Sequence, residues 1–395
     1  MAFQGVTMSA RWLVWLGDDW GYQMSSAQQL ARALAGQYRT LWVNSVGMRR
    51  PRLTRRDLVR MVMKLRRARS VAHDRDMDVT VANVPLIPFH RHPLVAAVNA
   101  RVARARVAGW RRRLGVEHLD VVCALPSAMP LVRALEPRRL VYYCMDDFAT
   151  LPGVDWPMVE ALEHELLAAA DAVIAASEWI ANLPRFQARG AKVLPHGVDY
   201  DHFSRAQAQP DAEIVRLVAH LPRPVIGFAG YLDQRIDLSL LTAIADAGRW
   251  GLLLLGEAAS DLRDLRHRQN VILAGFKPYG ELPRYLAACD VLVAPYVRSE
   301  STAALQPLKI PEYLATGKPI VATWIPALEA MADVVMLVDD TPAFLSAIER
   351  AAAAPAVGRS ERIARARAWS WESRARELAA LLGGTTLQTG EESRA

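Results

Sequence analysis

Cysteine is scarce in this chain of 395 residues. Its three cysteines, Cys123, Cys144 and Cys289, are scattered and odd in number, which excludes a disulfide framework and the close ligand spacing of a zinc site. Each lies in or beside an apolar run, so we expect buried free thiols and a reducing, cytoplasmic setting. Residues Met1–Trp20 lack a long apolar core behind a basic start, and no window of about 18 residues is free of charge. The sequence therefore predicts neither a signal peptide nor a transmembrane helix.

The chain is too long for one ordinary domain, and 52% of its residues are hydrophobic, so we expect two cores. The formal net charge of +7 is modest, but positive charge is concentrated between Arg49 and Arg69, where Asp57 is the single acid. The basic residues of this segment are Arg49, Arg50, Arg52, Arg55, Arg56, Arg60, Lys64, Arg66, Arg67 and Arg69. Such a segment implies an anionic partner, which could be a membrane surface, a nucleic acid or a phosphorylated substrate.

From Thr54 to Arg69 the pattern predicts a helix with apolar residues on one side and basic residues on another. A helix lying on an anionic membrane and a solvated helix packed on its own domain explain this pattern equally well. A second basic helix is expected at Leu94–Leu114, and it moves the interpretation toward a membrane surface.

Apolar runs alternate with helical patterns along the chain, which is typical of α/β domains with parallel sheets. The expected buried strands are Arg11–Gly17, Thr40–Asn44, Asp120–Leu125, Leu140–Met145, Ala172–Ala176, Pro224–Gly230, Gly251–Leu255, Val271–Leu273, Val291–Ala294 and Val334–Val338. Residues Phe203–Arg223 are polar and show little periodicity, so they are predicted to be a linker. A terminal helix is expected at Arg365–Leu382, followed by a frayed tail.

Residues Ser301–Thr323 combine a polar loop, a short helix and a buried strand. The helix can take Pro311 in its first turn, and Gly317 supplies the left-handed residue that ends it. Its N-terminus, together with Lys309, would bind a phosphate, and Glu312 could accept hydrogen bonds from a vicinal diol such as a ribose. The alternative is an ordinary helix with a solvated lysine and glutamate.

The run Pro307–Thr323 (PLKIPEYLATGKPIVAT), preceded by Cys289–Tyr296 (CDVLVAPY), resembles the donor-site signature of group 1 glycosyltransferases, and in particular those that make bacterial surface polysaccharides. The resemblance covers most of the second half of the chain strongly and the first half thinly. It implies the α/β fold called GT-B, with two Rossmann-like domains facing across a cleft and a C-terminal helix that crosses back to the first domain. The expected parts are an acceptor-binding domain at 1–205, a nucleotide-sugar-binding domain at 206–368, and a crossover helix and tail at 369–395.

The resemblance also implies roles for single residues. Glu312 would hold the ribose of the donor, Lys309 and Arg235 its diphosphate, and the loop that contains Gly275 and Lys277 its base. Many retaining members of the family carry a second glutamate eight positions before the ribose ligand, where this chain has Ala304. The donor base, the sugar and the stereochemistry therefore stay open.

A general base is expected where the strand Leu140–Met145 ends, at Asp146 and Asp147, because the carboxyl ends of parallel strands carry the binding sites of such sheets. A carboxylate there can take the proton from an acceptor hydroxyl as it attacks the anomeric carbon. One of the two aspartates could instead cap the next segment. Asp18, Asp19 and His196 are the next candidates.

The function that these patterns favour is a glycosyltransferase (hexosyltransferase) that moves a sugar from a nucleotide-sugar to a lipid-linked or saccharide acceptor, without a further cofactor or a metal, in the synthesis of surface polysaccharide. The expected location is the inner face of the cell membrane, with the basic helix at 54–69 as its contact, and the oligomeric state stays open. One alternative is a nucleotide-sugar epimerase of GT-B fold, which needs no acceptor. Another is a nucleic-acid-binding protein that uses the segment Arg49–Arg69, although aromatic residues are not interleaved with its arginines.

Overall fold

The computed structural model describes residues 11–21, 24–45, 48, 71–74, 79–87, 92–115, 119–151, 154–208, 211–303 and 305–383. The predicted basic helix at 54–69 and Ala304 lie outside these residues. The chain forms two compact units, one made of 1–195 with 374–395 and the other of 196–373. The observed division thus falls ten residues before the boundary expected at 205, and 374–395 returns to the first unit. In the described part of the chain, no helix combines the length and the apolar character needed to cross a membrane.

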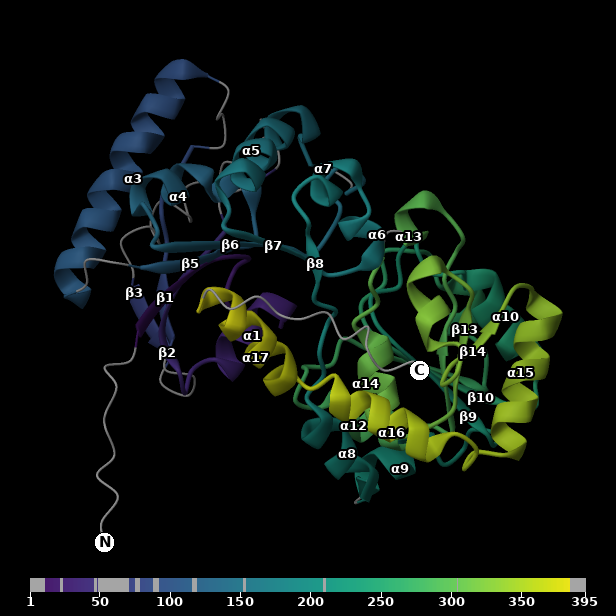
Figure 1. Ribbon diagram of the computed structural model, residues 1–395. Coiled ribbons are helices and arrows are strands. Elements are labelled where there is room, and N and C mark those ends of the chain that lie inside the picture. Colours follow the sequence, from purple (N-terminus) through teal and green to yellow (C-terminus); the bar gives the residue numbers. More distant parts are fainter. Residues whose placement is uncertain are drawn as a thin grey trace, which may run out of the picture. The chain divides into compact units, whose positions relative to one another are not determined.

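Unit 1 is built on an 8-stranded sheet with the order β3-β4-β2-β1-β5-β6-β7-β8, parallel except for the β3–β4 pair (Figure 1). Its strands are β1 (Arg11–Leu16), β2 (Tyr38–Val43), β3 (Val71–Asp74), β4 (Val79–Ala82), β5 (Asp120–Cys123), β6 (Arg139–Cys144), β7 (Ala172–Ala175) and β8 (Lys192–Val193). Most of the inner strands are buried almost throughout, because a parallel sheet is covered by helices on both faces. Continuous apolar runs such as LVWL in β1 meet this requirement.

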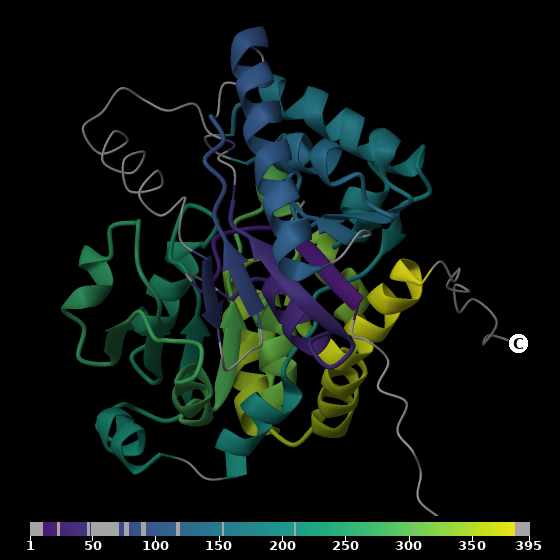
Figure 2. The same cartoon turned by 90° about the vertical axis from the view of Figure 1, so that its left-hand side faces the viewer.

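The helices of unit 1 are α1 (Ser26–Ala33), α3 (Pro93–Leu114), α4 (Met129–Leu135), α5 (Trp156–Ala169), α6 (Glu178–Ala181) and α7 (Pro184–Gln187), with a short 3-10 turn at Pro126–Ala128. Figures 1 and 2 show α3, α4 and α5 together on one face of the sheet. The cap of α1 follows the sequence prediction, since the Ser25 side chain accepts a hydrogen bond from the backbone N–H of Gln28. All three cysteines are free and buried, as predicted.

Unit 2 contains a 6-stranded parallel sheet with the order β11-β10-β9-β12-β13-β14. Its strands are β9 (Val225–Ala229), β10 (Gly251–Leu255), β11 (Val271–Gly275), β12 (Val291–Ala294), β13 (Ile320–Thr323) and β14 (Met336–Val338). In chain order this is 3-2-1-4-5-6, the arrangement of the dinucleotide-binding Rossmann sheet, with the strand order reversing between β9 and β12.

Two groups of helices cover this sheet (Figure 1). One group packs around α14 and contains α8 (Tyr200–Ala208), α12 (Leu282–Ala287), α14 (Lys309–Thr316) and α16 (Arg359–Ala368). The other contains α10 (Leu238–Asp246), α11 (Arg263–Arg266) and α15 (Thr341–Ala353). The remaining elements are α9 (Ala212–Val218), α13 (Glu300–Ala303), a 3-10 turn at Pro326–Met331, and α17 (Trp371–Leu382).

Two predictions about chain organisation were wrong. The expected linker at Phe203–Arg223 contains α8 and α9 and belongs to unit 2, because Phe203 and Ile214 are buried in the unit 2 core. The expected single helix at Arg365–Leu382 is divided at Trp369 into α16 and α17. The division has a tertiary cause, since Val198 donates its backbone N–H to the carbonyl of Trp369 (2.9 Å).

Candidate functional site

The candidate site in unit 2 lies where the strand order reverses. Ligands of open α/β sheets bind beyond the carboxyl ends of the strands at such a point. Gly230 follows β9 directly, Tyr296 follows β12, and α14 begins with Lys309. The predicted helix is confirmed, with Pro311 in its first turn and Gly317 in the left-handed conformation (φ 70°) at its end.

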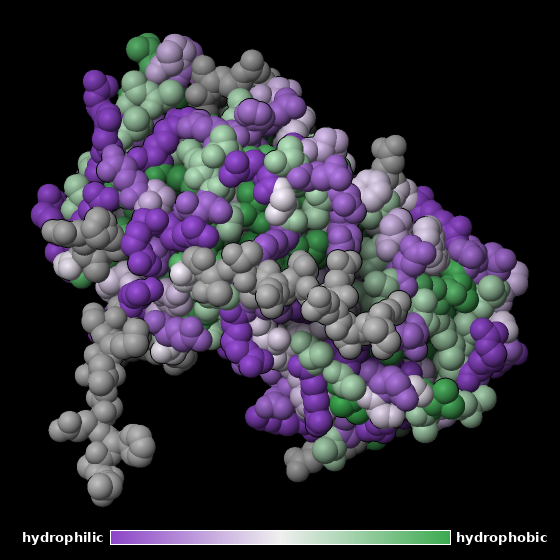
Figure 3. Space-filling model, viewed as in Figure 1, coloured by the Kyte–Doolittle hydropathy of each residue, from purple (hydrophilic) through white to green (hydrophobic). Residues whose placement is uncertain are grey.

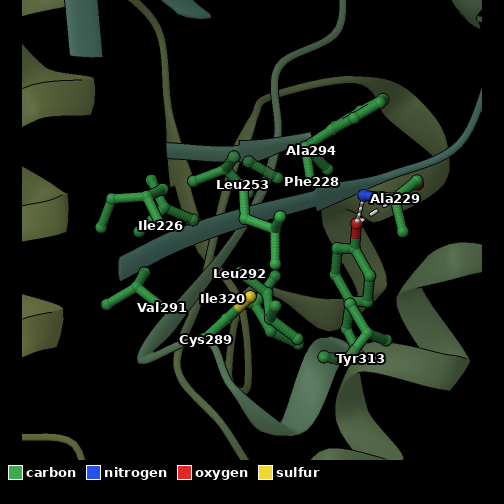
Figure 4. Packing of buried hydrophobic residues seen from close by; sticks show 14 of the residues in the cluster. Ile226, Phe228, Ala229, Leu253, Cys289, Val291, Leu292, Ala294, Tyr313 and Ile320 are labelled. Carbon is green, nitrogen blue, oxygen red and sulfur yellow. Dashed lines mark hydrogen bonds between the residues drawn. The ribbon is translucent and has the colours of Figure 1, made fainter. Parts of the chain in front are cut away.

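A buried tyrosine joins α14 to the end of β9 (Figure 4). The hydroxyl of Tyr313 accepts a hydrogen bond from the backbone N–H of Ala229 (2.7 Å) and donates one to the carbonyl of Ala229 (3.3 Å). Because residues four apart share a helix face, Tyr313 and Lys309 both point toward β9. The helix that carries Lys309 and Glu312 is therefore held in register with the strand that leads to Gly230.

Lys309 lies against two aromatic rings. Its Nζ is 4.0 Å from the ring centroid of Phe228 and 5.2 Å from that of Tyr296, which is the geometry of cation–π contacts. Gly230 makes this position possible, because a Cβ atom there would lie 2.7 Å from Nζ. Burial lowers the pKa of Lys309 to about 7, and the positive charge of Arg235 also lowers it. The carboxylates of Glu312 and Asp233 partly oppose this shift, because they favour the charged form of the lysine.

Glu312 is half-buried one turn into α14. Burial raises the pKa of its carboxyl group to about 8, and the nearby Lys309 opposes this shift. Among the residues that the structure describes, none donates a hydrogen bond to this carboxylate. A ligand with two neighbouring hydroxyl groups could therefore donate hydrogen bonds to a carboxylate that accepts none from the described part of the protein.

Arg235 is held in the loop after β9 by a two-pronged ion pair with Asp233. Its Nε lies 3.0 Å from both carboxylate oxygens of Asp233, and its Nη2 lies 2.7 Å from Oδ2. Burial alone would raise the pKa of Asp233, but the hydrogen bonds and charge of Arg235 lower it below its usual value. The structure thus brings Arg235, Lys309 and Glu312 together as charges that influence one another.

A cavity of about 690 Å³ opens at the carboxyl ends of β10 and β11 and reaches Leu232, which follows β9. Arg235, Lys309 and Glu312 do not line it, but its wall residue Gly256 lies against Gly230, and Gly230 lies against Lys309. Gly275 and the exposed Phe276 contribute to its wall. The predicted companion Lys277 instead places its Nζ 4.9 Å from the ring centroid of Tyr285 and is not among the residues that line the cavity.

Gly256, which also lines this cavity, was missed by sequence reasoning. Its N–H donates to the carbonyl of Gly275 (2.8 Å), and a Cβ atom on it would lie 1.9 Å from the carbonyl oxygen of Gly230. No side chain fits between these two backbones, so this position requires glycine. The signal that could have found it is a glycine directly after an apolar strand, in LLLLG.

In unit 1, the two candidate bases after β6 have different surroundings. Asp146 is exposed, whereas Asp147 is buried and its Oδ1 accepts a hydrogen bond from Arg185 Nη2 (2.6 Å). The same guanidinium donates from Nε to the buried Glu163 (2.7 Å), which also accepts a hydrogen bond from the hydroxyl of Tyr142 (2.7 Å). Asp147 also accepts a hydrogen bond from the backbone N–H of Ala149 (3.3 Å). Of the two aspartates that could cap the next segment, Asp147 is therefore the one that does so.

The next candidate bases are engaged or buried. Asp18 accepts hydrogen bonds from Ser25 Oγ (2.9 Å) and Gln28 Nε2 (2.8 Å), and its pKa is raised, chiefly by burial. Asp19 accepts two hydrogen bonds from Ser45. His196 is 6% exposed, and burial lowers its pKa to about 4. Across the described ranges, His, Cys, Asp and Glu side chains do not gather in a group of three that could hold a metal ion.

Residues 223–354 match the family model described as glycosyl transferases group 1. A protein of Bacillus subtilis (strain 168) assigned to teichuronic acid biosynthesis as glycosyltransferase TuaH is 27% identical over 210 residues, which are 49% of this chain and 52% of that protein. The 2-deoxystreptamine glucosyltransferase of Streptomyces kanamyceticus is 30% identical over 246 residues, which are 54% of this chain and 61% of that protein. The matches thus span about half to three fifths of the curated relatives.

Solved structures resemble the chain over nearly its whole length. Sucrose-phosphate synthase from Thermosynechococcus elongatus has a TM-score of 0.67 at 17% identity, covering 95% of this chain and 98% of that one. Anabaena HepE in complex with UDP-glucose has a TM-score of 0.62 at 18% identity, covering 94% and 99%. At such identities the likeness shows the fold, and the predicted GT-B fold is confirmed. Residues 223–354 are a group 1 glycosyltransferase domain, in a chain that has the fold of GT-B glycosyltransferases.

Proposed function

We propose that the protein is a glycosyltransferase that takes a sugar from a nucleotide-sugar donor bound by unit 2 and moves it to an acceptor bound by unit 1. The observation that carries this proposal is the group formed by Arg235, Lys309 and Glu312 at the reversal of the strand order, which Gly230 and Gly256 connect to a cavity of about 690 Å³. The volume of the cavity suits a nucleotide, and the positive charges of Arg235 and Lys309 suit its diphosphate. The complex of HepE with UDP-glucose and the names of the curated relatives support the same class of donor.

The proposed chemistry uses the residues of each unit for one part of the reaction. The acceptor oxygen bonds to the anomeric carbon while the bond from that carbon to the diphosphate oxygen breaks. The leaving diphosphate gains negative charge, which Arg235 and Lys309 neutralise, while Glu312 fixes the ribose. The hydroxyl proton of the acceptor passes to a carboxylate of unit 1, for which the exposed Asp146 is the first candidate.

The acceptor that we propose is a lipid-linked or saccharide molecule of a surface-polysaccharide pathway. The relative assigned to teichuronic acid biosynthesis supports this class of acceptor. The other curated relative is named for glucosyl transfer to 2-deoxystreptamine, so the family resemblance alone leaves a choice of acceptors.

A membrane surface on the cytoplasmic side is proposed as the place where the acceptor is met, and α3 supports it. This helix of 22 residues contains six arginines and no acid. Leu94 is 72% exposed and Val98 is 44% exposed near its start. Exposed arginines continue along the helix at Arg101, Arg104, Arg112 and Arg113. Hydrophilic side chains prevail over this part of the surface, with apolar ones among them (Figure 3). Exposed apolar residues beside arginines fit an anionic bilayer.

The decisive experiment combines a thermal-shift screen with product analysis. Nucleoside diphosphates and nucleotide-sugars that bind unit 2 should raise the melting temperature by mass action. The donor found in this way is then incubated with and without saccharide and lipid-linked acceptors. Transfer that requires an acceptor supports the proposal, whereas conversion of the nucleotide-sugar to an epimer without any acceptor would establish the alternative enzyme class. If no nucleotide shifts the melting temperature, the donor-site assignment is wrong.

A further inference from the structure

A second cavity lies in unit 2, at the carboxyl ends of β12, β13 and β14, with a volume of about 250 Å³. Its lining comes from the segments after these strands and from the starts of α10 and α15. It shares no lining residue with the cavity of about 690 Å³ that the proposed function gives to the nucleotide.

The wall of this cavity contains a buried hydroxyl that has no hydrogen-bond partner among the described residues. Thr323 ends β13 and is 6% exposed, and its Oγ1 makes no hydrogen bond in the described part of the chain. Thr316, which is buried to a similar degree in the same unit, shows the usual arrangement: its Oγ1 donates to the carbonyl of Tyr313 (2.6 Å) and accepts the N–H of Lys318 (3.1 Å). Since a buried hydroxyl without a partner is unfavourable, a molecule that bonds to Thr323 would gain affinity from it.

The charges around the cavity exclude an anion. Asp237 and Asp340 cap α10 and α15, and each accepts backbone N–H groups, with distances of 2.9 Å from Ser239 and 2.7 Å from Ala343. A third carboxylate, Asp339, is paired with Arg298, which is the one cationic residue among the described residues of the lining. Three carboxylates against one guanidinium repel a phosphate and favour a ligand that donates hydrogen bonds through hydroxyl groups.

The remaining lining suits one face of a sugar ring. Tyr296 and Phe344 are aromatic, and Leu240 and Val338 are aliphatic, so they can contact the C–H groups of a pyranose. The volume of about 250 Å³ lies below the range of roughly 300–1,000 Å³ that is common for drug-sized ligands, which limits the occupant to one ring. We propose that this cavity binds a single monosaccharide unit, free or at the end of a glycan, at a site separate from the nucleotide-sugar site.

The proposal does not depend on the transfer activity, but the two sites share a side chain. The ring of Tyr296 lines the monosaccharide cavity and also lies 5.2 Å from Lys309 Nζ. Binding tests must therefore distinguish a sugar in this cavity from a sugar that occupies the nucleotide site.

Saturation-transfer difference NMR of the full chain with D-glucose, D-galactose and N-acetyl-D-glucosamine is a suitable test, because it detects millimolar binding. We expect at least one of the three sugars to give a signal that remains when UDP is added. If none of them binds, or if UDP abolishes every sugar signal, the proposal is overturned.

Variants then locate the sugar. Thr323→Val removes the unpaired hydroxyl at nearly constant volume. The loss of one hydrogen bond to the sugar should weaken sugar binding about 2- to 10-fold, and the melting temperature should not fall. Thr316→Val is the matched control, which should lower the melting temperature and leave sugar binding intact, since its hydroxyl is satisfied within the protein. Val338→Phe fills the cavity and should abolish binding. Wild-type affinity in both Thr323→Val and Val338→Phe would show that the sugar binds elsewhere and would refute the site.

Discussion

Replacing Glu312 by alanine tests the proposed ribose contact. The carboxylate lies half-buried on α14 next to Lys309 and has no hydrogen-bond donor among the described residues of the protein. Two ribose hydroxyls would donate to it, and hydrogen bonds to a charged group contribute about 1.5–3 kcal/mol. The dissociation constant of a nucleoside diphosphate should therefore rise about 10- to 150-fold in Glu312→Ala.

The same contact predicts a pH dependence. Burial raises the pKa of Glu312 to about 8 in the free protein. Hydroxyl donors favour the carboxylate form, so they lower this pKa in the complex. The contribution of Glu312 to affinity is then fully present above about pH 8 and is lost as the pH falls through the pKa of the complex. The ratio of variant to wild-type dissociation constants should accordingly be larger at about pH 9 than at about pH 6.

Isothermal titration calorimetry with UDP, ADP and GDP at these two pH values provides the measurement. Lys309 changes its charge in the same range, and its pKa falls further when the charge of Glu312 is removed. The ratio therefore reports the carboxylate of Glu312 together with its effect on Lys309. Glu361→Ala, an exposed glutamate on α16, is the matched control and should bind like the wild type. Unchanged affinity of Glu312→Ala for all three nucleotides would refute the ribose contact, and a ratio that does not vary with pH would refute the protonation argument.

Three further predictions follow from unit 1, the start of unit 2 and α3. Asp146→Asn should lower kcat and leave donor affinity unchanged in steady-state kinetics. Asp147→Asn should also lower the free energy of unfolding by about 1–3 kcal/mol, because it weakens the hydrogen bond to Arg185. Wild-type rates in both variants would place the base elsewhere. The pKa of His196 is lowered to about 4 from 6.5, so between these pH values the unfolded state binds a proton that the folded state does not. About 3 kcal/mol of stability should therefore be lost as the pH falls from 6.5 to 4. Urea unfolding should show a smaller loss in His196→Asn, and an equal loss would contradict this account. Changing three of the exposed arginines of α3 to glutamine should release the protein from anionic vesicles in a sedimentation assay. The same change at three exposed arginines of unit 2 should not, and equal binding of both variants would argue against the α3 surface. The α3 set is Arg101, Arg104 and Arg112, and the control set is Arg205, Arg216 and Arg263.

Elements whose signal lies within a few neighbouring residues were predictable from the sequence. The core strands β1, β6 and β9 are continuous apolar runs, because both faces of a parallel sheet are buried. The short helix α14 was predictable too, since Pro311 fits only its first turn and Gly317 fits the left-handed end. These residues impose backbone conformations on their own, without help from distant parts of the chain.

The linker prediction failed because the sequence of α8 and α9 carries only a weak helical pattern of apolar residues. In Phe203–Arg223 only Phe203 stands alone among polar residues, and the apolar residues of IVRLV at 214–218 form a run too short to define a helix by its periodicity. The burial of Phe203, Ile214 and Val218 in the unit 2 core shows that they belong to helices. In the same way, the break between α16 and α17 depends on the backbone of Val198, which is far away in the sequence. Helix formation in marginal segments is decided by tertiary packing.

For the candidate site, the sequence by itself determined which residue types lie on α14 and in the loop after β9. Lys309 and Glu312 belong to the helix and Arg235 to the loop, and both elements could be predicted from neighbouring residues. The tertiary structure decided what each group can do. It paired Asp147 with Arg185 and left Asp146 exposed, and it placed Gly230 against Lys309 and Gly256 against Gly230. These outcomes depend on contacts between segments that are distant in sequence, because burial and partner choice, which set pKa values and the space for a ligand, exist only once the sheet has brought those segments together.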